Sequence, residues 1–87
     1  MSVKKSIQKL FSLPTEMRIA EIETILAHFG YRLVNINGSH FQFKNHASMK
    51  ITIPVHNSSV KKVYLKIIKR NIMPLLRTKR SITKQEI

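Results

Sequence analysis

The stretch Asn37-Gly38-Ser39-His40-Phe41-Gln42-Phe43-Lys44 decides the fold of this chain. Asn37-Gly38 is the strongest short signal for a β-hairpin, because both central residues of a type I′ turn need positive φ. After the turn, apolar and polar side chains alternate, which predicts a strand over residues 39–44. Phe41 and Phe43 then face a core, and His40 is the first residue that faces the other way.

Two more strands complete an antiparallel sheet in this prediction. Residues 31–36 precede the turn and are rich in strand-forming side chains, and residues 49–55 follow with apolar side chains at alternate positions. An antiparallel sheet commonly buries one face and leaves the other in water. We therefore expect an open face with the side chains of His40, Gln42, Lys44, Lys50 and Thr52.

Helical periodicity predicts amphipathic helices on both sides of the strands. A short helix over residues 3–13 ends before Pro14, and a longer one over 16–29 begins after Thr15, a good N-cap. The last helix spans about residues 60–72, with Asn57-Ser58-Ser59 as caps and Pro74 beyond its end. Its predicted buried stripe is Val60, Val63, Tyr64, Ile67 and Ile68.

These elements predict an α+β domain of α-β-β-β-α order over residues 1–74. Residues 1–14 are an N-terminal extension with a short helix, and residues 75–87 are a basic tail. Both long helices cover one face of the three-stranded antiparallel sheet. This plan matches the double-stranded-RNA-binding architecture.

Charge is the strongest signal in the composition. The 87 residues include 16 Lys and Arg against 4 acids, for a formal net charge of +12. A field of that sign attracts polyanions: nucleic acid first, an acidic protein second and an anionic membrane surface third. An ordinary basic surface without a partner is the plain alternative.

Several classes of function are excluded by what the sequence lacks. There is no Cys, hence no disulfide, thiolate nucleophile or Cys-based zinc site, and no Asp for a Ser-His-Asp triad. Four scattered histidines predict no metal site, and two glycines cannot form a phosphate-cradling loop, so no cofactor is expected. No apolar run approaches the roughly 20 residues that span a bilayer, and the N-terminus does not resemble a secretory signal. We therefore expect a cytoplasmic protein.

The open sheet face carries residues suited to cutting RNA. Histidine is the side chain that accepts and donates protons near neutral pH. RNA cleavage needs no metal if a base takes the 2′-hydroxyl proton and cations stabilise the phosphate. His40 is the candidate base, and Lys44 and Lys50 are candidates to hold phosphate. An ordinary solvated strand face explains the same pattern, and spacing alone leaves both interpretations open.

Two motifs carry a resemblance to a known family. Gly38-Ser39-His40 precedes a short strand, and Thr52-Ile53-Pro54-Val55-His56 leads into a helix. Together, in this order and spacing, they resemble the HicA family of toxins, small mRNA interferases with a double-stranded-RNA-binding-like fold. The segment Leu10-Phe11-Ser12-Leu13-Pro14-Thr15 resembles the longer-armed branch of that family. The resemblance extends over about residues 3–72.

The resemblance implies roles for individual residues. The catalytic histidine of the family falls on His40, and Gly38 and Ser39 fall on the turn that presents it. Many members carry a second histidine next to the first, where this chain has Phe41. His56 falls after the proline of the third strand, where a role in the loop is as plausible as one in catalysis. The resemblance also implies a HicB-type antitoxin that blocks the toxin.

The sequence thus predicts a metal-independent endoribonuclease toxin that cuts mRNA, with His40 as its catalytic residue. The predicted RNA contacts are Ser39, Gln42, Lys44, Lys50, Lys61 and Lys62. The main alternative is a non-catalytic RNA-binding module of the same fold. A third reading, a DNA-binding protein, fits less well, because the chain has a central sheet and no helix-turn-helix spacing.

Overall fold

The region around Asn37 and Gly38 forms the expected hairpin in a computed structural model of the protein. The structure describes residues 2–47 and 49–86, without the side chains of residues 77–86. Its elements, in chain order, are α1 (Val3–Phe11), β1 (Glu16–Arg18), α2 (Ile19–His28), β2 (Arg32–Asn37), β3 (His40–Lys44), β4 (Lys50–Pro54), β5 (Ser59–Lys61) and α3 (Lys62–Glu86).

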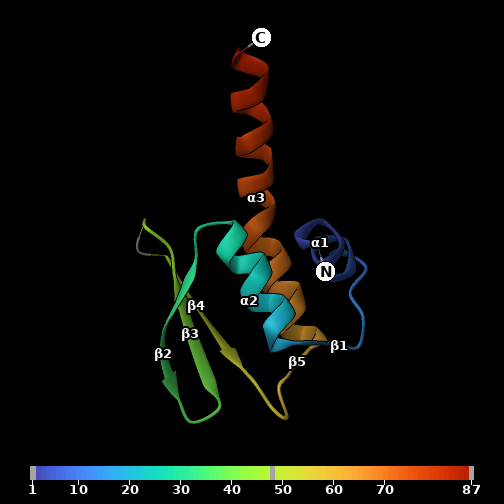
Figure 1. Cartoon of the computed structure of the whole chain (residues 1–87), viewed down its shortest axis with the longest axis vertical. Helices are drawn as coiled ribbons and strands as arrows, with labels where there is room; N and C mark the ends of the chain where they lie inside the picture. Colours follow the sequence, from blue (N-terminus) through green and yellow to red (C-terminus); the bar gives the residue numbers. More distant parts are fainter. Residues whose placement is uncertain (1, 48, 87) are drawn as a thin grey trace.

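The strands β2, β3 and β4 form one antiparallel sheet, with β3 in the middle. Figure 1 shows α2 and α3 on one side of this sheet and its other side uncovered. The short helix α1 packs against α2 and α3, away from the sheet. The predicted α+β class and α-β-β-β-α order are confirmed. The division into a domain over 1–74 and a tail over 75–87 stays a prediction.

The turn between β2 and β3 lies one residue later than predicted. Asn37 still belongs to β2 and pairs with His40, so the two-residue loop is Gly38-Ser39. Only Gly38 has positive φ, at 62°, which is the φ pattern of a type II′ turn and not of type I′. The predicted turn type was wrong because Gly, and not Asn, takes the first central position.

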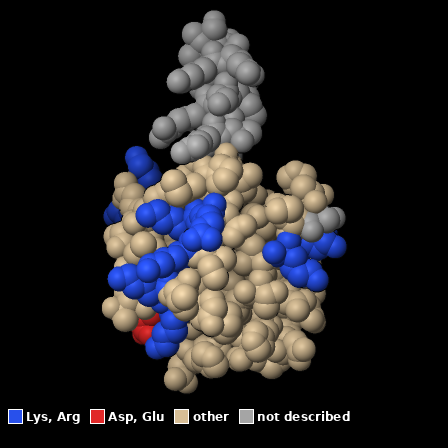
Figure 2. Space-filling view, turned by 180° about the vertical axis from the view of Figure 1, so that it is seen from behind, with Lys and Arg blue, Asp and Glu red and all other residues tan. Residues whose placement is uncertain are grey.

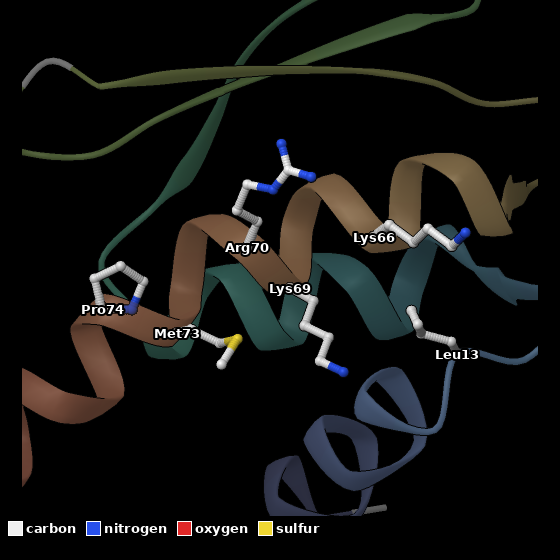
Figure 3. A pocket seen from close by; sticks show the side chains of 6 residues that line it. All are labelled: Leu13, Lys66, Lys69, Arg70, Met73 and Pro74. Atoms are coloured by element: carbon white, nitrogen blue, oxygen red, sulfur yellow. The ribbon is translucent and has the colours of Figure 1, made fainter.

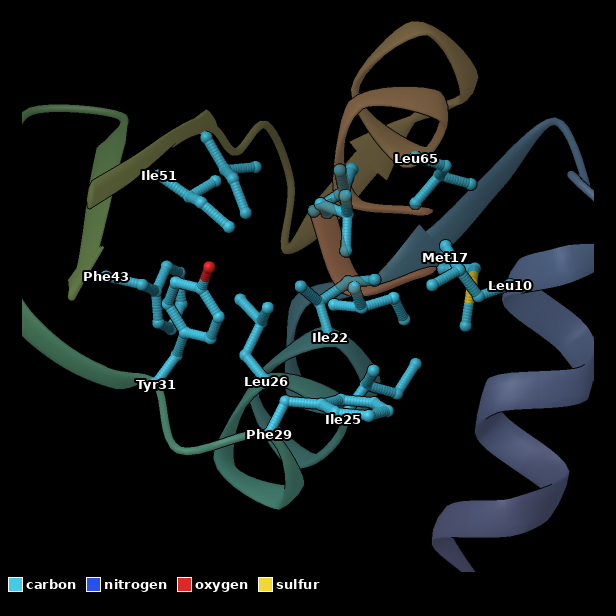
Figure 4. Packing of buried hydrophobic residues seen from close by; sticks show 14 of the residues in the cluster. Leu10, Met17, Ile22, Ile25, Leu26, Phe29, Tyr31, Phe43, Ile51 and Leu65 are labelled. Carbon is cyan, nitrogen blue, oxygen red and sulfur yellow. The ribbon is translucent and has the colours of Figure 1, made fainter. Parts of the chain in front are cut away.

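The inner face of the sheet packs on α2 to form the core (Figure 4). Phe43 of β3 and Ile51 of β4 are paired across the strands and buried. They belong to one cluster with apolar side chains of α2 and of the segment that follows it. Those side chains are Ile22, Ile25, Leu26, Phe29 and Tyr31.

A second, two-stranded sheet was missed by the sequence analysis. The first residues of the helix predicted over 16–29 instead form β1, which pairs with β5 so that buried Met17 lies opposite buried Val60. The helix α2 begins only at Ile19, and the Glu21 carboxylate accepts the Arg18 N–H at 3.2 Å in place of the predicted Thr15 cap. Pairing across 45 residues overrode the local helical pattern.

The residues predicted to cap the last helix, Asn57-Ser58-Ser59, instead take part in a tight turn and the start of β5. Asn57 and Ser58 have φ of 52° and 62°, the φ pattern of a type I′ hairpin turn, and His56 and Ser59 close it with reciprocal backbone hydrogen bonds. Because β5 uses residues 59–61, α3 starts at Lys62.

This shift changes which face of α3 is buried. Leu65, Ile68 and Ile72 are fully buried, whereas Val63 is 57% exposed and Ile67 is 42% exposed. Of the predicted stripe, Ile68 is buried on α3 and Tyr64 is half-buried against the core, whereas Val63 and Ile67 are exposed. Val60 is buried as predicted, but on β5 and not on the helix. Two apolar stripes with helical spacing run along this segment, and the sequence alone did not decide between them.

The helix α3 also continues past its predicted end at residue 72, and Pro74 lies inside it. A proline inside a helix removes one backbone hydrogen bond and crowds the carbonyl four residues earlier. Leu75 and Leu76 pack against the core, so continuing the helix keeps two further apolar side chains on the buried side. Most side chains of the predicted basic tail lie outside the described residues.

The helix phase can be tested with two neighbouring substitutions. We expect Ile68→Ala to lower the free energy of unfolding by about 2–5 kcal/mol, because it leaves a cavity among buried side chains. Ile67→Ala is the matched control and should cost less than about 1 kcal/mol. Urea unfolding of both variants measures the difference, and equal costs would contradict the burial described above.

Candidate nucleic-acid interface

The uncovered face of the sheet carries three rows of residues, each row running across β2, β3 and β4. Strand register fixes the members of each row, since they are direct cross-strand partners. From the hairpin end, we name them the histidine row (Asn37, His40, Pro54), the amide row (Asn35, Gln42, Thr52) and the cationic row (Arg32, Lys44, Lys50). No helix of the described chain covers these rows (Figure 1).

His40 is held on a rigid part of this face. Its backbone pairs with β2 on one side and β4 on the other, and the Val55 N–H donates to the neighbouring Ser39 carbonyl at 2.7 Å. The His40 side chain is exposed, and within the described part of the chain its imidazole has no hydrogen-bond partner. Both ring nitrogens are therefore available to a bound molecule.

The structure does not bring Lys44 and Lys50 to His40. They are cross-strand partners of each other, four residues along β3 from His40. At about 3.3 Å per residue, the two ends of this face lie roughly 13 Å apart. Strand register therefore places Lys44 and Lys50 at the end of the face opposite to His40.

The structure instead places Arg32 opposite Lys44. Arg32 was not among the predicted contact residues. Regular pairing from the hairpin would have placed Leu33 opposite Lys44. An irregularity between Leu33 and Asn35 shifts the register by one residue, so that Arg32 lies opposite Lys44 and faces outward. No sequence signal announced this bulge.

The amide row lies between the two ends and offers neutral hydrogen-bonding groups. Gln42 accepts a hydrogen bond from the Asn35 amide at 3.4 Å, and Thr52 is exposed beside it. Ser39 lies in the hairpin loop, half-buried, next to His40. Of the predicted contact residues, Gln42 shares the face of His40, and Ser39 adjoins His40 in the loop.

Lys61 and Lys62 lie on another surface. Lys61 of β5 forms an ion pair with Glu16 of β1 at 3.2 Å, and Lys62 begins α3 on the helix side of the sheet. Figure 2 shows basic side chains gathered over α3 and, apart from them, a second group at the sheet. These two predicted RNA contacts are not brought together with His40.

A groove beside α3 is lined by both basic and apolar side chains (Figure 3). Lys69 is engaged there: its ammonium lies 5.1 Å from the centre of the Phe11 ring and 3.4 Å from the Phe11 carbonyl oxygen. The other residues that line the groove are Leu13, Lys66, Arg70, Met73 and Pro74. This groove holds no titratable histidine and belongs to the helix layer.

The remaining histidines do not assemble a metal site in the described part of the chain. The backbone of His56 closes the turn before β5, and its side chain is exposed. Among residues 2–47 and 49–86, no group of three or more His, Cys, Asp or Glu residues is placed to hold a metal ion. The helices, over the residues described, include none that is long and apolar enough to cross a membrane.

Comparison with known proteins identifies a family for this chain. A family model described as the HicA toxin of bacterial toxin–antitoxin systems matches residues 19–72, which is more than half of the chain. The match covers α2, the whole three-stranded sheet with its histidine row, and the buried part of α3. Searches of curated proteins and of solved structures found no match. The chain therefore belongs to the HicA family of toxins.

Proposed function

We propose that this toxin is a metal-independent endoribonuclease that cleaves mRNA, inhibits growth, and is neutralised by a HicB-type antitoxin. The observation that carries the proposal is the placement of His40. It is an exposed histidine without a protein hydrogen-bond partner, at the rigid end of the only uncovered face of the three-stranded sheet in the described structure. The acid-free, basic character of that face supports RNA as the substrate.

The proposed reaction uses the 2′-hydroxyl of RNA as the nucleophile. An imidazole nitrogen of His40 accepts the 2′-hydroxyl proton while the 2′-oxygen bonds to the adjacent phosphorus. The bond from phosphorus to the 5′-oxygen of the next nucleotide breaks, and that oxygen takes a proton from the imidazolium or from water. The products are a 2′,3′-cyclic phosphate and a free 5′-hydroxyl.

Groups next to His40 are suited to the developing charge on the phosphate. The exposed Asn37 side chain comes from the residue directly across from His40, and the Ser39 hydroxyl adjoins it in the loop. Both are neutral hydrogen-bond donors, which can stabilise phosphate oxygens in the transition state. Lys50 lies at the other end of the face and is not placed beside His40.

The first prediction of the proposal concerns His40 directly. In EDTA, the wild-type protein should cleave single-stranded RNA, and His40→Ala should cleave it about 10²–10⁴-fold more slowly. The side chain is exposed, so the free energy of unfolding should change by less than about 0.5 kcal/mol. His56→Ala, a second exposed histidine, is the control and should retain activity. An alanine variant at position 40 that cuts as fast as wild type contradicts the assignment.

A second prediction concerns growth. Induced expression of the wild-type protein should arrest a bacterial culture, and His40→Ala should not. Co-expression of the proposed HicB-type antitoxin should restore growth without lowering toxin levels, because the partner acts by binding. If both wild type and His40→Ala arrest growth, growth inhibition does not depend on His40, and the prediction is wrong.

The alternative is an RNA-binding module without catalysis. The cationic row favours it, because this row provides affinity for RNA at a place where His40 takes no part. Such a module would bind RNA with strong salt dependence and leave it intact in the cleavage assay above.

A further inference from the structure

We propose that the cationic row is a second phosphate subsite, so that an unpaired RNA strand runs along β3 from His40 to this row. The inference rests on the proposed function for the position of the cut, and it adds the path and the minimum length of the substrate. It also assigns binding roles to Arg32 and, beside it, to His46.

The first support is the arrangement of like charges. Arg32 lies directly opposite Lys44, and Lys44 lies directly opposite Lys50. Like charges in direct cross-strand pairs destabilise a sheet. Three in one row on an exposed face are therefore an unfavourable arrangement for the free protein, and a bound anion would reverse it.

The second support is the absence of nearby acids. Of the four glutamates, Glu16 lies on β1, Glu21 and Glu23 lie on α2, and Glu86 lies near the end of α3. Among the residues whose side chains are described, the ion pairs are Lys9 with Glu21 and Lys61 with Glu16. The charges of the cationic row are thus not neutralised within the described chain.

The third support is a hollow next to the row. Its lining combines Arg32 and Lys44 with His46, Asn45, Gly30 and Val34. The side chain of Asn45 accepts the N–H groups of Ala47 and Met49 at 3.0 and 2.9 Å, which fixes the turn that leads to Lys50.

Two features of this hollow suit a nucleotide. The His46 ring lies beside Gly30, with its Nδ1 3.6 Å from the position that a Cβ on Gly30 would take. The bulge leaves Val34 48% exposed, an apolar surface beside the cations. A phosphate on the cations and a sugar or base against Val34 fit this combination.

The geometry favours a single strand over a duplex. Recognition of double-stranded RNA spans about 16 base pairs, whereas the five residues of β3 cover only about 16 Å. A positively charged track that follows the backbone is one element of single-strand binding sites. The amide row provides neutral hydrogen-bonding groups between the two phosphate positions.

The test compares three forms of the full-length protein: wild type, the row variant (Arg32→Gln, Lys44→Gln, Lys50→Gln) and a control variant (Lys4→Gln, Lys5→Gln, Lys66→Gln). The control removes the same charge from exposed residues on α1 and α3. The substrate is a synthetic RNA of about 12 nucleotides around a site that wild type cuts, with each flank shortened stepwise.

We expect the row variant to raise KM for the full substrate about 10–100-fold, as the loss of charge-assisted hydrogen bonds implies, with kcat changed less than threefold. Shortening one flank should raise KM for wild type by a similar factor and leave KM of the row variant unchanged. The control should behave as wild type. Equal effects of both variants, or a row variant that remains as sensitive to shortening as wild type, would overturn the inference.

Failure of the proposed function is a different result. If wild type cuts no RNA, the proposed reaction is wrong, and binding of an unstructured RNA of about 12 nucleotides then tests the subsite alone. The slope of log affinity against log salt should be smaller by about 2 in the row variant and unchanged in the control. Equal slopes in all three forms would refute the subsite as well.

Repulsion between the charges of the cationic row can be tested in the free protein. Lys44→Gln removes the central charge of the row and should raise Tm by about 2–6 °C in low salt. The gain should shrink in about 0.5 M salt, where charges on the surface are screened. Lys66→Gln is the control, and an equal or absent gain would contradict mutual repulsion within the row.

Discussion

The burial of Phe43 against α2 is the constraint on which the functional face depends. Side chains alternate along a strand, so a buried Phe43 and a packed Phe41 force His40, Gln42 and Lys44 to the opposite face. A slip of one residue in register would bury the histidine and expose both aromatic rings. The position of His40 is therefore set by the hydrophobic core and needs no specific contact of its own.

The bulge in β2 is the second determinant of this face. Without it, Leu33 would lie opposite Lys44, and the outer end of the sheet would hold two cations and no arginine. With it, Leu33 joins Phe43 on the core side and Arg32 joins the lysines. One extra residue in an edge strand thus satisfies the core and completes the cationic row at once. Bulges commonly redirect side chains near functional sites in this way.

The sequence predicted the parts of the fold that depend on local patterns, and it failed where distant segments pair. The three strands, the stripe of α2 and the outward direction of His40 follow from alternation and helical spacing. The short sheet of β1 and β5 does not, because Met17 and Val60 contact each other only after the chain folds. The phase of α3 was equally undecidable, since both Val63 with Ile67 and Leu65 with Ile72 have helical spacing. Arg32 was missed for a related reason: its outward direction depends on a register shift that no residue type signals.

The distribution of charge differs between the two sides of this small basic domain. The acids whose side chains are described lie on β1 and α2, where two of them pair with Lys9 and Lys61 and so lower the local field of the helix layer. Lys69 is held over Phe11 in the same layer. The uncovered sheet face has basic residues and no acid, so its potential is not offset. The core fixes His40 on this same face, at the opposite end from the three basic residues.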